Sequence, residues 1–211
     1  MIEQLMACKT AEQGLQFVRE KGWGDASADL DMDAVLKCEE EKAWKVIRET
    51  APDMSVFDVL SYPKLYHNLK AAIKAVCTEN RERNIFYDDC AISGEEMMQI
   101  IENREFSRLP EHMKQAAEEA FETLLHTADG QLCDIIVDRA ALEAIREAGQ
   151  KSKEPMIENY ADTTVAIADI KIAVRSQKTG KSADFMRSAM AKCRGGSVER
   201  LSQAALAGID E

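Results

Sequence analysis

The chain has 211 residues, of which 45% are hydrophobic and only 6% aromatic, a mixture that favours helices over strands. Its formal net charge of −11 argues against a main role in nucleic-acid binding, because phosphate neutralisation needs a continuous basic surface. Charged residues interrupt every apolar run before it reaches membrane-spanning length, so we expect a helical protein that does not cross a bilayer.

Six cysteines are scattered along the chain without any Cys-x-x-Cys pair, and the residues ahead of them do not have the pattern expected of a signal peptide. This pattern predicts reduced thiols and neither a disulfide framework nor a structural zinc site. The cysteines are Cys8, Cys38, Cys77, Cys90, Cys133 and Cys193.

Helical periodicity runs through most of the chain, and no segment indicates a strand. We expect helices over about 33–50, from Ser61 onward, after Pro110, over about 134–149, and from Met156 to Val174. Asp129-Gly130 is expected to close the region after Pro110, and Gly149 to end the helix that follows. Three apolar stripes support these helices: Leu65, Leu69, Ala72, Val76; Met113, Ala117, Ala120, Leu124; and Met156, Tyr160, Thr163, Ile167, Ile170, Val174.

The segment Gly180-Lys181-Ser182 resembles the end of a phosphate-binding loop. Such a loop needs a glycine five residues earlier, where the backbone must curl around phosphate oxygens, and Arg175 occupies that position. We therefore predict that Gly180 ends the preceding long helix and that Ser182 caps the next one.

Two kinds of short pattern recur along the chain. Helix-capping patterns begin at Thr10, Ser93 and Ser182, and the motifs Asn68-Leu-Lys70 and Asp169-Ile-Lys171 each lie inside a long helix. The order predicts one helical repeat over 1–90, a second over 91–180 and the opening of a third over 181–211. Asn68 and Asp169 should then occupy equivalent positions.

No combination of residues indicates catalysis, a cofactor or a metal. His67, His112 and His126 have no acid–base or metal-ligand partner at a suitable spacing, and a lone histidine does not make a site. We expect no catalytic, cofactor-binding or metal-binding residue.

The segment 171–200 is the exception to the acidic composition, since eight basic and two acidic side chains give it a local charge of +6. Such a field can steer an acidic partner, although a solvated helix face is the simpler interpretation. We select Arg187 and Arg194 as candidate partner-binding residues. Their exchange for glutamate is expected to slow assembly while leaving the melting temperature nearly unchanged.

The two long-helix motifs lead to a family. Tyr66-His-Asn-Leu-Lys70 with Ala71-Ala72, and Asp169-Ile-Lys171 continuing to Arg175, resemble repeated signatures of one family of V/A-type ATPase subunits, which is named C in prokaryotes and d in eukaryotes. The opening from Ile2 to Gly24 is also similar to that family. The family-motif positions are Asn68, Lys70, Asp169, Lys171 and Arg175.

Departures from the family pattern are few. Lys64 and Val165 stand where family members usually have an acidic residue four positions before the motif asparagine, and Asp169 replaces the second asparagine. The family's last long-helix motif and N-terminal segment are absent, which predicts a truncated or shortened homologue.

The resemblance implies an all-α protein, part of a funnel of three similar domains about a pseudo-threefold axis. Family members are non-catalytic and need no cofactor. They lie on the cytoplasmic face of the membrane rotor ring, peripheral to the bilayer and soluble as isolated chains. There they receive the foot of the central stalk and couple ion translocation to ATP synthesis or hydrolysis. The alternative function is a free-standing helical-repeat scaffold for protein interaction, and an enzyme ranks third.

Overall fold

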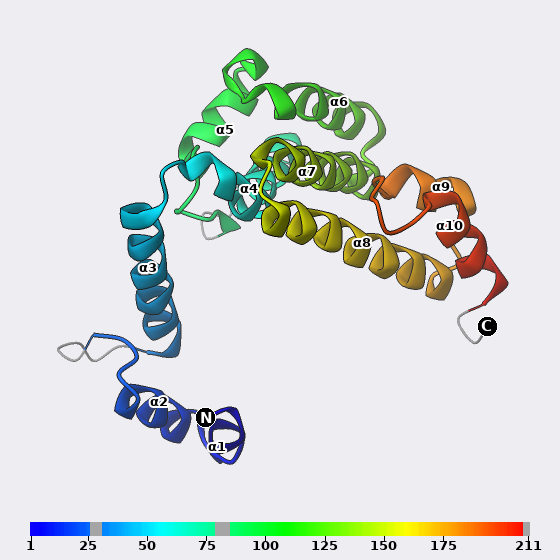
Figure 1. The fold of residues 1–211 in the computed structure, drawn as a ribbon. Coiled ribbons are helices and arrows are strands. Elements are labelled where there is room, and N and C mark those ends of the chain that lie inside the picture. The colour runs from blue at the N-terminus through cyan, green and yellow to red at the C-terminus, as the bar shows by residue number, and fades with distance from the viewer. Residues whose placement is uncertain (26–30, 79–84, 209–211) are drawn as a thin grey trace. The chain divides into compact units, whose positions relative to one another are not determined.

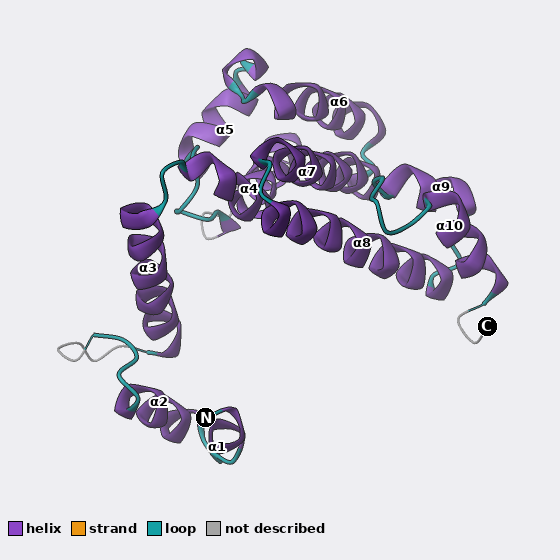
Figure 2. Ribbon diagram, in the orientation of Figure 1, coloured by secondary structure: helices purple, strands orange, loops and turns teal. Residues whose placement is uncertain are grey.

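The computed structural model describes residues 1–25, 31–78 and 85–208, and its regular elements in these ranges are all helices (Figures 1 and 2). This confirms the all-α prediction. In chain order the elements are α1 (Ile2–Met6), α2 (Ala11–Glu20), α3 (Met32–Thr50), η1 (Met54–Phe57), α4 (Asp58–Thr78), α5 (Gly94–Glu102), η3 (Phe106–Arg108), α6 (Glu111–Thr127), α7 (Gly130–Ser152), α8 (Pro155–Lys178), α9 (Ala183–Ala189) and α10 (Val198–Ala207).

Packing divides the chain into two compact units, Met1–Met54 and Ser55–Glu211. These units are defined by contacts and not by repetition. The repeat limits at residues 90 and 180 therefore stay a prediction.

A glycine turn organises the first unit. Gly24 has a φ of +83°, and its N–H donates to Glu39 Oε1 at 2.8 Å while Lys42 Nζ donates to the Gly24 carbonyl at 2.9 Å. Val35 of α3 packs directly against this turn and is fully buried. The contacts join the end of the family-like opening segment to α3.

The main core of the second unit lies among α4, α5, α6 and α7. Its members are apolar side chains at helical spacing, including Leu65, Leu69, Ile73, Met97, Ile101, Met113, Ala117, Phe121 and Val137. The predicted stripes on α4 and α6 both face this core, and Val76, which is only partly buried, packs against its edge. Residue periodicity located these two helices correctly because each has one apolar face.

The start of α4 differs from the prediction. The helix begins at Asp58, after the 3-10 turn η1, and Pro63 lies inside it instead of at its first turn. Proline lacks the N–H that would bond to the carbonyl four residues earlier, so this turn loses one helical hydrogen bond.

The break predicted at Asp129-Gly130 is confirmed, since α6 ends at Thr127 and α7 begins at Gly130. Asp129 caps α7, accepting from the N–H groups of Gln131 and Leu132 at 2.9 Å each. The glycine near the end of α7 differs from the prediction. Gly149 does not end α7, which continues to Ser152. It lies where α7 meets α8, and a Cβ there would come within 2.4 Å of the Ala161 Cβ.

The end of α8 confirms the interpretation of Gly180-Lys181-Ser182. Gly180 has a φ of +65°, the Lys181 N–H returns to the Ser176 carbonyl at 2.9 Å, and the Ser182 hydroxyl accepts from the Phe185 N–H at 3.2 Å. One helix ends and the next is capped within these three residues.

Gly149 offers a direct test of the α7–α8 contact. We expect Gly149→Ala to lower the free energy of unfolding by about 1–3 kcal/mol, because the added methyl group must displace one helix from the other. The matched control is Gly130→Ala at the first position of α7, where a Cβ meets nothing within 4 Å. Urea unfolding of both variants checks the prediction. Equal stabilities would contradict the close helix contact.

Candidate interaction site on the long helices

The motif asparagine of α4 holds the chain segment that leads into α5. Asn68 is fully buried, its Oδ1 accepts from the Tyr87 N–H at 2.9 Å, and its Nδ2 donates to the Tyr87 carbonyl at 2.9 Å. Tyr87 lies six residues before Ser93, whose hydroxyl caps α5 by accepting from the Glu96 N–H at 3.1 Å. The amide therefore fixes the approach to the next helix.

Asp169 makes the corresponding contact from α8. Its side chain is 3% exposed, and Oδ1 accepts from the Ala191 N–H at 3.1 Å. Ala191 lies six residues before Ser197, which caps α10 through the Arg200 N–H at 3.4 Å. Asn68 and Asp169 thus each bind the backbone six residues before a serine that caps a helix. Equivalent positions in two repeats would be expected to do so. Their superposition stays a prediction.

These contacts pair the helix caps differently from the predicted repeat, which stays a prediction. Spacing alone matched Ser182 with Ser93, whereas the contacts of Asn68 and Asp169 match Ser93 with Ser197. The short helix α9 lies between α8 and that cap. The sequence intervals favour the pairing of Ser93 with Ser197. Ser93 lies 25 residues after Asn68, whereas Ser197 lies 28 residues and Ser182 only 13 residues after Asp169.

Replacing asparagine by aspartate changes the chemistry of the contact. An ionised carboxylate accepts hydrogen bonds but cannot donate one as the Asn68 amide does. Burial raises the pKa of Asp169 to about 6, and the hydrogen bond from Ala191 opposes that rise. The charged form is thus disfavoured at this position.

The basic residues of the two motifs have different surroundings. Lys70 pairs with Asp138 of α7 at 2.6 Å. Lys171 and Arg175 are exposed on α8 and have no ion pair within the part of the chain that the structure describes. Lys64, which departs from the family pattern, pairs with Asp89 at 2.5 Å. Val165, the other departure, is fully buried.

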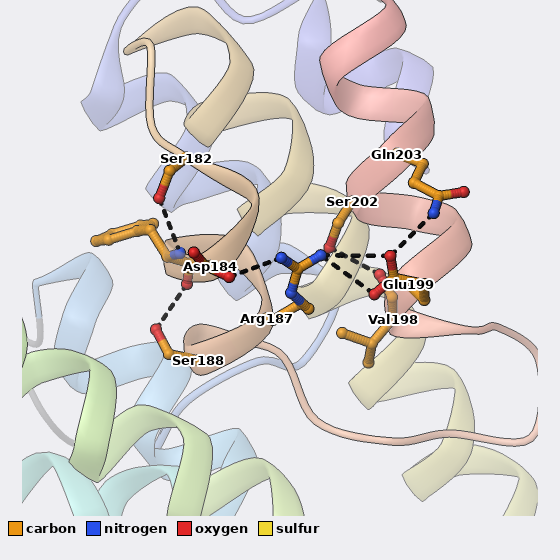
Figure 3. A network of polar contacts seen from close by, with 9 residues as sticks. Ser182, Asp184, Arg187, Ser188, Val198, Glu199, Ser202 and Gln203 are labelled. Carbon is orange, nitrogen blue, oxygen red and sulfur yellow. Dashed lines mark hydrogen bonds and ion pairs between the residues drawn. The ribbon is translucent and has the colours of Figure 1, made fainter.

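The two selected arginines are already engaged within the chain. Arg187 lies between Asp184 at 2.6 Å and Glu199 at 3.2 Å, which joins α9 to α10 (Figure 3). Arg194 pairs with Glu158 of α8, and its Nε lies 3.6 Å from Asp162. The expectation that charge reversal leaves melting unchanged does not fit these pairs. Partner binding by either arginine stays a prediction.

The outer face of α8 carries most of the large apolar side chains of the helix. Met156 is 80% exposed, Ile167 47% and Ile170 52%, whereas the opposite, buried face consists of smaller residues. The buried residues are Ala161, Val165, Asp169, Ala173 and Ser176. The stripe found in the sequence therefore marks an exposed surface, apart from the half-buried Val174 at its end. We call the set Met156, Tyr160, Thr163, Ile167, Ile170 and Val174 the outer stripe of α8.

The three histidines have local partners. His112 Nδ1 lies 3.0 Å from the Tyr66 hydroxyl, which donates to the His112 carbonyl at 2.8 Å, and burial lowers the pKa of His112. His67 Nε2 lies 2.8 Å from the Ile85 carbonyl, and His126 Nδ1 lies 2.8 Å from the Glu122 carbonyl. No group of three potential ligands is placed to hold a metal ion among the described residues.

The carboxyl group of Asp169 predicts a pH dependence of stability. Its folded pKa of about 6 lies above the ordinary value of 3.8, so its stabilising contribution is complete below about pH 4 and is lost as the pH rises through 6. We expect Asp169→Asn to raise the free energy of unfolding by about 1–3 kcal/mol at pH 7.5 and by much less at pH 4. Urea unfolding at both pH values measures the difference.

The converse variant is the control. Asn68→Asp removes the donor to the Tyr87 carbonyl and places a charge in a fully buried site, so it should destabilise the protein more at pH 7.5 than at pH 5. A pH-independent effect of both variants would contradict the assigned protonation.

Arg187 gives a separate prediction. We expect Arg187→Glu to lower the melting temperature, because it gathers three carboxylates where the arginine now bridges Asp184 and Glu199. Lys192→Glu, which changes an exposed residue with no ion pair among the described residues, is the matched control and should melt close to the parent. Thermal unfolding in low and high salt compares them, and high salt should narrow the difference. Identical melting temperatures of the two variants would show that the ion pairs of Arg187 do not stabilise the fold.

Comparison with known proteins identifies the family. The family model described as ATP synthase (C/AC39) subunit matches residues 1–211. The chain is 25% identical over 158 residues to the C subunit of the V-type sodium ATPase of Enterococcus hirae, a match that covers 75% of this chain and 48% of that relative. The match thus spans about half of the relative's length, and no solved structure matches the chain. Because the family model covers every residue, the chain belongs to the ATP synthase (C/AC39) subunit family, whose members are non-catalytic subunits of rotary ATPases.

Proposed function

We propose that the chain acts as an adaptor in the central rotor of a V/A-type ATPase, linking the membrane rotor ring to the central stalk. The match of the C/AC39 family model to the whole chain carries this proposal. In this role the chain couples ion translocation to ATP synthesis or hydrolysis without performing chemistry itself. It would lie at the cytoplasmic face of the membrane as a peripheral subunit.

The packing of the second unit suits a part that transmits force. Four helices share one core, and their side chains interlock at helical spacing, an arrangement that resists shear. Asn68 and Asp169 add buried polar ties between the long helices and the approach to the next helix. None of the described helices is long and apolar enough to span a bilayer.

The outer stripe of α8 is the surface that we assign to a partner subunit. Large apolar side chains gather in the centre of protein interfaces, and here they lie along one face of a continuous 24-residue helix. The exposed cations Lys171, Arg175 and Lys178 lie toward its C-terminal end. They have no ion pair among the described residues, so they are available to an acidic partner surface.

The experiment is co-purification with the rotor subunits. We expect the 211-residue chain, carrying an affinity tag, to retain ring and stalk subunits from detergent-solubilised membranes of the source cells. The double variant Ile167→Glu with Ile170→Glu should lose most of that retention, because two charges would enter the apolar stripe. Both side chains are about half exposed, so the fold should persist, and circular dichroism checks this.

The matched control is Leu125→Glu on α6, since Leu125 is 46% exposed and lies outside the outer stripe. It should retain the rotor subunits like the parent. Equal retention of the rotor subunits by all variants would show that the interface does not lie on the outer stripe of α8. Recovery of the parent with unrelated proteins and without ATPase subunits would overturn the adaptor role and favour a free-standing scaffold.

A further inference from the structure

A cavity of about 470 Å³ lies beside α8, between this helix, the loop after α9 and the first turns of α10. Its lining contains one buried carboxyl group, several aliphatic side chains, and the polar residues Cys193, Ser197 and Arg200. The residues that matter here are Asp169, Ala166, Ile170, Val198, Leu201 and Ala204.

Asp169 is only partly satisfied in its buried site. Its Oδ1 accepts from the Ala191 N–H at 3.1 Å, and Oδ2 has no partner among the described residues. The equivalent contact of Asn68 uses both ends of the amide on Tyr87. One carboxylate oxygen in the cavity lining is therefore left to accept from a ligand.

The lining restricts the chemistry of that ligand. A metal ion needs more ligands than are present, because no group of three His, Cys, Asp or Glu side chains is placed for one in the described ranges. An anion would meet the Asp169 carboxylate. Arg200 also lines the cavity, yet it forms no ion pair with Asp169. An elongated group with an aliphatic stem and a cationic end matches the aliphatic walls and the carboxylate together.

We propose that this cavity binds a lysine or arginine side chain of a partner protein, whose cation pairs with Asp169 while its methylene groups pack on the aliphatic walls. The cavity shares Ile170 with the outer stripe of α8, but its cation-binding group, Asp169, lies outside that stripe. The raised pKa of Asp169 agrees with it, because burial without a cation disfavours the charged form. A bound cation would return the pKa toward its ordinary value.

The probe is n-pentylammonium chloride, which carries the stem and charge of a lysine side chain, and 1-pentanol is its neutral counterpart. Titration into the ¹⁵N-labelled 211-residue chain at pH 7.5 should shift the amide resonance of Ala191, whose N–H bonds to Asp169. We expect saturable binding in the millimolar range for the ammonium and at least about tenfold weaker binding for the alcohol.

Two variants complete the test. Asp169→Asn keeps an oxygen for the Ala191 N–H but removes the charge, and should weaken ammonium binding at least about tenfold. Ala204→Phe fills the cavity while keeping Asp169, and should also abolish binding. Titration of the Asp169 carboxyl ¹³C resonance should give a lower pKa with the ammonium present. Equal affinity of ammonium and alcohol, or unchanged ammonium binding by Asp169→Asn, would overturn the proposal.

Discussion

The second unit depends on one kind of hydrogen bond. In each case a buried polar side chain on a long helix binds the backbone of the segment that leads to a later helix. Asn68 holds Tyr87, and Asp169 holds Ala191, each six residues before a serine cap. A buried amide or carboxyl group is costly without partners, so the segment must pass at that position to satisfy it. The direction in which α5 and α10 begin follows from this requirement.

The second constraint is how closely α8 approaches α7. Gly149 on α7 leaves space for Ala161 on α8, and the buried face of α8 is built from small residues throughout. Met156, Ile167 and Ile170 lie on the opposite, exposed face, whereas Ile157 and Ile172 pack against smaller clusters at the flanks of this contact. The same packing that holds α8 in place therefore leaves its outer stripe exposed.

The basic side chains of the segment 171–200 have two different roles. Arg187 and Arg194 form ion pairs that tie α9, α10 and the loop between them to their surroundings. Lys171 and Arg175 stay exposed along α8 without such pairs among the described residues. A sequence gives all these side chains the same charge. Only their distances to carboxylates decide which of them can meet a partner.

The sequence by itself determined the helical class, the two long helices, the helix boundary at Gly180 and the motif residues Asn68 and Asp169. These depend on local periodicity, on capping and on glycine conformation, which a few neighbouring residues specify. The tertiary structure decided which face of α8 is buried, that Gly149 is a contact and not a helix end, and that Asn68 and Asp169 each bind the backbone six residues before a serine cap. It also decided that Arg187 is paired and that Asp169 lines a cavity. Each of these depends on contacts between helices distant in sequence, whose distances the order of residues does not express.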